Sequence, residues 1–152
     1  MTARTMIPRA TFALICITAC ASVPKADNNL VASARSFTPS PGRARIYVAR
    51  VKSLIGAALT QTVVVDGRII GATGPGTFLM TEVDPGPHVV SAAAQGNAQA
   101  QQIDAEAGQC YFIKMSLNTI ALTVSVKIER VTETEGRDLV RRYRMAAPTQ
   151  GQ

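Results

Sequence analysis

Short runs of apolar, β-forming residues separated by turn residues make up the chain from Arg43 onward. The clearest run alternates Leu122, Val124, Val126 and Ile128 with polar residues. A period of two predicts a strand with one buried face and one solvated face. Similar runs predict further strands over residues 44–51, 62–65, 68–70, 77–83, 88–94, 99–103 and 110–116.

Two turn motifs divide these runs. Asp66-Gly67 lies between β-forming residues and predicts a type I′ hairpin, because both central residues of that turn need a positive φ. Asp84-Pro85-Gly86-Pro87 predicts a second tight turn, with proline presetting φ and Gly86 free to take the positive value.

The period changes near the C-terminus. Thr132 and Glu135 match a capping box, and a helix running to about Met145 would place Leu139 and Val140 on one side. Residues 43–147 are therefore expected to form one mainly β domain. We expect a small antiparallel β-sandwich or barrel of about seven strands with one C-terminal helix.

The first nineteen residues have the pattern of an export signal. Residues 1–9 contain two arginines and no acid, and residues 10–19 are apolar and uncharged. As a helix, ten residues reach roughly 15 Å, half of a 30 Å hydrocarbon core. This segment is too short to span a membrane stably, so we interpret residues 1–19 as a signal peptide.

The signal ends in Ile17-Thr18-Ala19-Cys20, which resembles the lipobox of bacterial lipoproteins. The resemblance implies that the Cys20 thiol receives a diacylglyceryl group, that the chain is cut before Cys20, and that the new amino group takes a fatty acid such as palmitate. The alternative is ordinary secretion with cleavage after Ala19. Ala21, where an Asp would favour retention at the inner membrane, favours the outer membrane facing the periplasm.

The segment after the signal has no apolar periodicity. Residues 20–42 contain three prolines among Ala, Ser, Asn and Thr, and we interpret them as the lipidated cysteine followed by a flexible linker. Such a linker would have an end-to-end distance of roughly 25 Å. Residues 148–152 are interpreted as a disordered tail.

The order of the motifs resembles a family of bacterial envelope domains, the domain of unknown function 2846. The hairpin followed by the Pro-Gly-x-His turn is more loosely similar to PEGA domains, which are small β-sandwich modules of bacterial surface proteins. The resemblance implies no catalytic residues. The matching pieces are residues 44–50, 63–67, 76–79, 83–88 and 107–113.

Composition narrows the classes of partner. Hydrophobic residues make up 47% of the chain, as in a folding domain, and aromatic residues make up 5% with no Trp. The low aromatic content argues against nucleic acid, because single-stranded nucleic acid is bound by stacking on aromatic side chains. The formal net charge is +6, and Arg4 and Arg9 lie in the presumed signal. No cofactor is expected.

Two residues suggest chemistry inside the domain. His88 is the only histidine, and Cys110 would be the only unmodified cysteine of the mature chain. A Cys–His pair could serve a hydrolase or transferase, but no orienting group or oxyanion site is indicated. We expect Cys110 to be a buried small hydrophobic residue and His88 to be structural.

Other polar and glycine clusters have simpler interpretations. Gly71, Gly74 and Gly76 are expected to be turn glycines, since no Lys-Ser/Thr follows as in a phosphate loop. No spacing of metal ligands is present. Glu133 and Glu135 suit a helix start. Three arginines near the end of the helix could contact anionic lipid or an acidic polymer, or form a solvated face: Arg141, Arg142 and Arg144.

Together these patterns predict a membrane-anchored envelope lipoprotein whose domain is a non-enzymatic binding or structural module. Its expected partners are the membrane, through the lipid on Cys20, and another envelope protein or an envelope polymer. Two alternatives remain open. One is a tethered hydrolase or transferase using Cys110 and His88, and the other is a carrier with a small-ligand pocket between its sheets.

Overall fold

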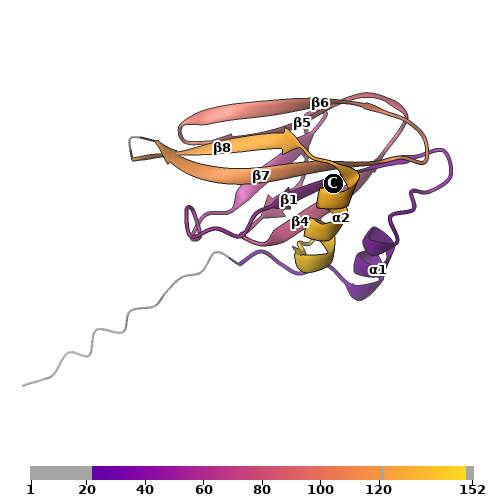
Figure 1. Cartoon of the computed structure of the whole chain (residues 1–152), viewed down its shortest axis with the longest axis horizontal. Helices are drawn as coiled ribbons and strands as arrows, with labels where there is room; N and C mark the ends of the chain where they lie inside the picture. The colour runs from indigo at the N-terminus through magenta and orange to yellow at the C-terminus, as the bar shows by residue number, and fades with distance from the viewer. Residues whose placement is uncertain (1–21, 121, 150–152) are drawn as a thin grey trace, which may run out of the picture.

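The computed structural model describes residues 22–120 and 122–149, which form two β-sheets packed face to face (Figure 1). The five-stranded sheet has the order β8-β7-β1-β4-β9, and the four-stranded sheet has the order β3-β2-β5-β6. The sheets do not close into a barrel, so the expected mainly β sandwich is confirmed. The strands are β1 (Ala44–Arg50), β2 (Gln61–Val65), β3 (Arg68–Thr73), β4 (Thr77–Val83), β5 (Gly86–Ala94), β6 (Asn97–Ala105), β7 (Cys110–Ile120), β8 (Thr123–Arg130) and β9 (Arg144–Met145).

The two turns behave as their sequences predict. Asp66 and Gly67 have φ values of 50° and 78° and join β2 to β3 as a type I′ hairpin. The turn after Val83 has Gly86 at a φ of 132°. It joins β4 to β5, which belong to different sheets, so this turn is a corner of the sandwich.

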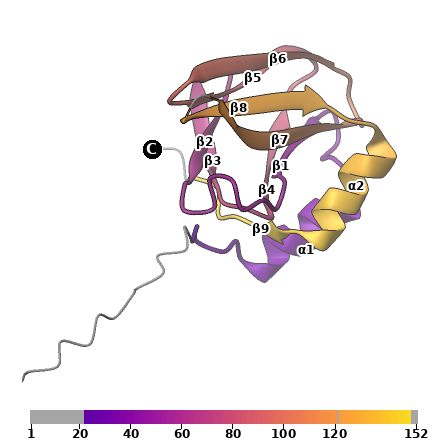
Figure 2. The ribbon, with the colours of Figure 1, turned by 60° about the vertical axis from the view of Figure 1, so that its left-hand side comes forward.

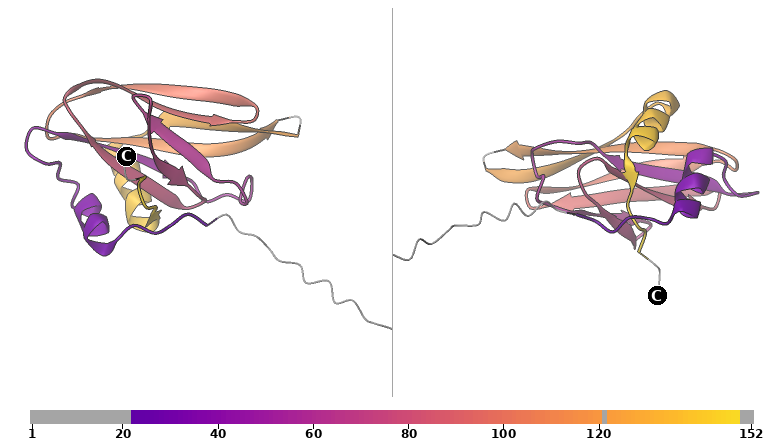
Figure 3. Two further views of the ribbon diagram at one scale, coloured as in Figure 1. Left: turned by 180° about the vertical axis from the view of Figure 1, so that it is seen from behind. Right: turned by 90° about the horizontal axis from the view of Figure 1, so that it is seen from below.

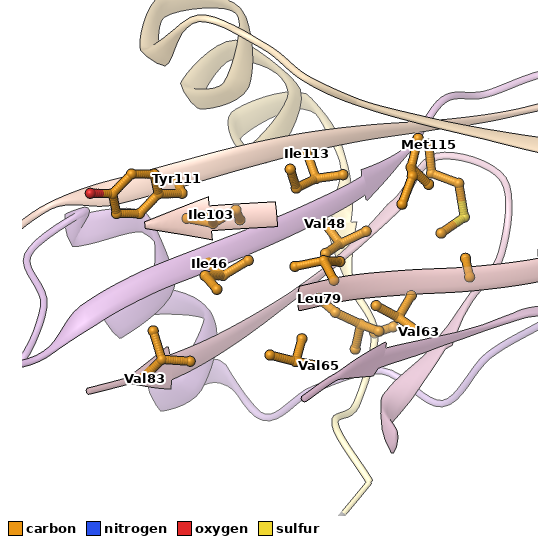
Figure 4. Packing of buried hydrophobic residues seen from close by; sticks show 14 of the residues in the cluster. Ile46, Val48, Val63, Val65, Leu79, Val83, Ile103, Tyr111, Ile113 and Met115 are labelled. Carbon is orange, nitrogen blue, oxygen red and sulfur yellow. The ribbon is translucent and has the colours of Figure 1, made fainter. Parts of the chain in front are cut away.

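Strand β1 is buried on both faces and organises two cores. It pairs antiparallel with β4 and parallel with β7. Ile46 and Val48 face the interior of the sandwich, while Tyr47 and Ala49 face the opposite side. Figure 4 shows the first core, where side chains from both sheets meet: Ile46, Val48, Val63, Val65, Leu79, Ile103, Ile113 and Met115.

The second core lies under two helices, α1 (Asn28–Ser36) and α2 (Glu133–Arg142), which cover the outer face of the five-stranded sheet (Figure 2). The rings of Tyr47 and Phe112 stack there with centroids 5.0 Å apart. Thr132 caps α2 by accepting a hydrogen bond from the backbone N–H of Glu135 at 3.3 Å. The predicted C-terminal helix and its N-cap are therefore confirmed, and the helix ends at Arg142, before Met145.

The structure differs from the flexible linker expected over residues 20–42. Within the described part of that segment, α1 forms and the side chains of Val23, Ala26 and Ala34 are buried. Lys25 forms a β-bridge with Ala146. The linker prediction is wrong for residues 22–42, because contacts with the domain hold a segment that has little local periodicity. Residues 1–21, with the signal and Cys20, lie outside the described residues.

Two smaller expectations are also wrong. The first two residues of the expected disordered tail are paired, since Pro148 bridges Gly71 and the Thr149 N–H donates to the Ile70 carbonyl at 3.0 Å. Leu122 does not share the buried face of β8. It lies before that strand with a φ of 67° and is exposed, because the chain is already turning there.

The strands place the loops at two opposite ends of the sandwich (Figures 1 and 3). We call one the Leu54 end, formed by residues 51–60, 74–76, 95–96 and 122. The other is the His88 end, formed by the turns at residues 66–67, 84–85 and 106–109. The functional candidates divide between these two ends.

Candidate functional site

Cys20 is the one site residue that the sequence predicts, and the described residues begin two positions after it. Val23, three positions later, is buried, and its carbonyl accepts a hydrogen bond from Arg144 Nη2 at 3.4 Å. The N–H of Ala147 donates to the Pro24 carbonyl at 2.8 Å. The polypeptide is thus attached to the domain from Val23 onward.

His88 joins two turns at the His88 end. Its Nδ1 lies 2.6 Å from Asp66 Oδ2 in the hairpin turn, and its Nε2 lies 2.7 Å from the carbonyl oxygen of Asp84 in the corner. The N–H of Val89 donates to Asp66 Oδ1 at 2.8 Å. Both neighbours of the ring are acceptors, so the arrangement suits an imidazolium that donates from both nitrogens.

The pKa shifts agree with this ion pair. Burial would lower the pKa of His88, but the hydrogen bonds with Asp66 and with the Asp84 carbonyl outweigh it and raise the pKa. Burial would likewise raise the pKa of Asp66, but hydrogen bonds from His88 and from the Val89 N–H lower it. The pair is a charged crosslink within the four-stranded sheet, between the β2–β3 turn and β5.

A polar cleft of about 740 Å³ opens beside this crosslink. Its charges are largely paired with one another. Arg43 forms an ion pair with Asp84, and Arg45 Nε donates to Glu82 Oε1 at 2.8 Å. The charged residues along the cleft are Arg43, Asp66, Arg68, Glu82, Asp84 and His88.

Cys110 begins β7 and is half-buried rather than buried as expected. Its Sγ donates to the Phe37 carbonyl at 3.3 Å, and burial raises the pKa of the thiol. A raised pKa disfavours the nucleophilic thiolate at neutral pH.

The structure does not bring Cys110 and His88 together. Cys110 packs with Phe112 on the outer face of the five-stranded sheet, under the helices. His88 is on the face of β5 that it shares with Val90, which belongs to the core between the sheets. The backbone of the five-stranded sheet therefore separates the two side chains.

The three arginines near the end of α2 have separate roles. Arg141 lies over the ring of Phe37 with 5.6 Å between its Cζ and the ring centroid. Arg142 pairs with Asp138 one turn earlier in the helix, and Arg144 reaches the Val23 carbonyl. Each of the three arginines therefore has a different contact in the domain.

The helix-start acids and the glycine cluster have structural partners. Glu133 pairs with Arg137, and Glu135 pairs with Lys114 of β7 at 2.9 Å.

Gly71 lies inside β3 and not in a turn as expected. An added Cβ on Gly71 would stand 2.8 Å from Leu79 Cδ2. Gly74 and Gly76 flank the turn before β4, as expected.

Sequence reasoning overlooked Arg50 and the loop that follows it. Arg50 is 2% exposed, and burial lowers the pKa of its guanidinium. Its nitrogens donate to the carbonyls of Leu59, Gly56 and Thr73 at 2.6, 2.7 and 3.2 Å. An arginine directly after the apolar run over residues 46–49 was the signal that could have indicated this role.

Two features are absent from the part of the chain that the structure describes. Across residues 22–120 and 122–149, no three His, Cys, Asp or Glu side chains gather as they would around a metal ion. Over the same ranges, the structure contains no helix with the length and apolar character needed to cross a membrane.

Two stacked sheets with a helical layer over one of them define a small β-sandwich domain with two cores. Residues 40–127 match the family described as protein of unknown function (DUF2846), and the chain belongs to this family. The family expected from the motif order is thus confirmed. The chain is also similar to an uncharacterized protein of Haemophilus influenzae, with 29% identity over 131 residues, covering 86% of this chain and 77% of that protein.

Proposed function

We propose that this protein is an envelope lipoprotein, anchored through acyl chains on Cys20 and cut free of its signal before that residue. The observation behind the proposal is the position of Cys20, directly after two small residues and a charge-free apolar segment. Stable anchoring takes two or more acyl chains, which this modification supplies. The outer membrane, facing the periplasm, is the proposed location.

The packing of the following residues adds a consequence for the anchor. An extended chain spans about 3.5 Å per residue, so the Cα atom of Cys20 lies within about 11 Å of that of Val23. Val23 is buried in the domain. A lipid on Cys20 would therefore hold the domain against the bilayer surface, where a flexible linker would let it stand clear.

We propose a non-enzymatic binding or structural role for the domain. Cys110 and His88 belong to different sheets and lie on opposite sides of the five-stranded sheet, and most charged side chains along the cleft form ion pairs. Another envelope protein or an envelope polymer is the proposed partner. A tethered hydrolase or transferase would need a reactive thiolate, which the raised pKa of Cys110 disfavours.

Metabolic labelling with a palmitate analogue tests the anchor. A Cys20→Ser variant is expected to lose the label and to leave the membrane fraction, because the serine hydroxyl cannot form the thioether to the lipid. Cys16→Ser is the matched control, since Cys16 lies in the discarded signal, and it should keep the label. Labelling that persists in Cys20→Ser, or disappears in Cys16→Ser, contradicts the proposal.

A further inference from the structure

Large apolar side chains are exposed at the Leu54 end. Leu54, Ile55 and Leu59 of the loop over residues 51–60 are 95%, 43% and 37% exposed, and Leu122 in the turn before β8 is 97% exposed. Isolated apolar residues on a surface are normal, but several gathered at one place mark a contact surface. Two further exposed apolar residues, Ile69 and Val89, lie in the four-stranded sheet toward the His88 end.

The loop that presents these residues is fixed to the domain. Arg50 holds it from within by hydrogen bonds to the carbonyls of Gly56 and Leu59. Gly56 has a φ of 66°, and an added Cβ there would stand 2.5 Å from Leu117 of β7. Because the backbone is held on both sides, Leu54 and Ile55 point outward as part of an ordered surface.

The chain that leads to Cys20 meets the domain beside this loop. Arg144 joins that chain to the turn over residues 74–76, which lies next to the loop, since its Nη2 donates to the Val23 carbonyl and its N–H donates to the Gly76 carbonyl at 3.2 Å. An added Cβ on Gly76 would contact Lys52, and the Lys52 N–H donates to Tyr143 Oη at 3.3 Å. In Figures 1 and 2, the first described residues lie close to the loop after β1.

Charge is distributed unevenly between the two ends. The loops of the Leu54 end, over residues 51–60, 74–76, 95–96 and 122, contain no Asp or Glu, while Lys52 and Arg144 are exposed there. Half of the ten acidic residues lie toward the His88 end: Asp66, Glu82, Asp84, Asp104 and Glu106. An anionic surface would attract the Leu54 end. At the His88 end, three of these acids are paired with Arg43, Arg45 and His88, so that end has no comparable excess of positive charge.

We infer that the Leu54 end is a membrane-contacting surface, with Leu54, Ile55 and Leu122 entering the boundary between headgroups and acyl chains. Lys52 and Arg144 face anionic headgroups. This inference rests on the proposed lipid anchor, because the short span from Cys20 to Val23 brings this end to the bilayer. The domain then stands with its cleft and the Asp66–His88 pair directed away from the membrane.

The absence of Trp from the sequence allows a direct test. Leu54→Trp is made in the full-length chain, which is expressed in a bacterium, extracted with its lipid and reconstituted into vesicles of phosphatidylethanolamine and phosphatidylglycerol. Some vesicles contain lipids brominated on the acyl chains, which quench only a buried indole. Val89→Trp is the matched control at the opposite end, and Leu122→Trp is a second probe if Leu54→Trp folds poorly.

The inference predicts that brominated lipid lowers the Leu54→Trp emission about twofold or more, with a shift to the blue, as expected for a side chain 5–10 Å below the interface. Val89→Trp should show neither effect. Equal, weak quenching of both probes overturns the inference, and so does a blue shift that depends only on protein concentration, which would indicate contact with a second copy.

Palmitate labelling of the same Trp variants separates this inference from the proposed anchor. Labelled protein whose Leu54→Trp probe is not quenched contradicts the membrane-contacting surface and leaves the anchor standing. Unlabelled protein contradicts the anchor. If the unlabelled Leu54→Trp chain is nevertheless quenched in the vesicles, the surface binds membrane by itself and the inference holds.

Discussion

Two polar side chains of this domain, those of His88 and Arg50, crosslink neighbouring turns and loops. His88 joins the β2–β3 turn to the corner between β4 and β5, and Arg50 joins the end of β1 to the loop after it. Each side chain makes several hydrogen bonds from a buried or half-buried position. Such bonds contribute to stability chiefly because leaving their buried partners unsatisfied costs free energy.

The Asp66–His88 pair predicts a pH-dependent contribution to stability. The raised pKa of His88 stabilises the fold below about pH 6.5, and this contribution fades as the pH rises through the folded-state value. The lowered pKa of Asp66 stabilises the fold above about pH 4, and this contribution fades as the pH falls through its folded-state value. The two effects overlap between about pH 4 and 6.5.

A His88→Gln variant should therefore lose more stability at pH 5.5 than at pH 9. We expect the free energy of unfolding to fall by about 1–2 kcal/mol at the lower pH, and by less at pH 9, because the contribution of the raised pKa of His88 fades as the pH rises. Urea denaturation at both pH values measures the difference. Asp104→Asn, at an exposed carboxyl of β6, is the control. An equal loss at both pH values would show that the ion pair makes no contribution.

Features of single residues could be predicted from the sequence where they depend only on the backbone conformation of neighbouring residues. Asp66-Gly67 predicted its turn correctly, because a type I′ turn needs positive φ values at its two central residues and these two residues adopt them readily. The Asp66–His88 pair was not predictable, because β3 and β4 separate the two residues in the sequence and the pair forms only when β5 lies beside β2. Leu122 was misassigned because it continues the alternation of β8 into a turn that the pattern does not mark.

At the scale of elements, α2 depends on close approach to the sheet. Gly136 is buried in the helix, and a Cβ there would overlap the ring of Phe112. This explains a glycine in a position where helix propensity alone would favour alanine. From the sequence, Gly136 only lowers the propensity of this segment to form a helix. Its advantage, the close approach of the helix to the ring of Phe112, becomes visible only in the folded domain.

Gly136→Ala should destabilise the protein although alanine favours helices. Propensity alone would favour the variant by up to about 1 kcal/mol. Overpacking against Phe112 is expected to reverse this, for a net loss of about 1–2 kcal/mol in the free energy of unfolding. Thr134→Ala, on the exposed side of α2, is the control and should change stability by a few tenths of a kcal/mol or less. Equal stabilisation by both alanines would exclude the packing explanation.

Helix α1 could not be predicted from its own residues. Asn28–Ser36 has no clear apolar face, and Asp27 is its clearest local signal, capping it through the Leu30 N–H at 2.9 Å. The helix is held by tertiary contacts. Burial raises the pKa of Tyr47 to about 12, and its protonated hydroxyl donates to the Ala34 carbonyl at 2.7 Å.

For the whole molecule, the class of fold was predictable but the strand order was not. Alternating runs and turn residues indicate a β-sandwich, because each run has one face that must be buried. The parallel pairing of β1 with β7 joins strands about sixty residues apart, and no local pattern specifies it. The buried segment from Val23 to α1 is likewise a product of the assembled domain.

The proposed lipid on Cys20 would decide how the molecule is held at the membrane. A lipid on Cys20 would be joined to the domain by a few residues, so the orientation of the domain and its distance from the bilayer would both be restricted. The cleft at the His88 end would then face the periplasm. This attachment requires that the mature chain begins at Cys20 and that Cys20 carries acyl chains.

Mass spectrometry of the intact protein extracted from membranes, with fragmentation of its N-terminus, tests this claim most directly. The account predicts a mature chain that begins at Cys20 and has a diacylglyceryl group on sulfur and a further acyl group on the amino terminus. A mature chain that begins at Cys20 with a free thiol and a free amine, or one that retains residues 1–19, would contradict it.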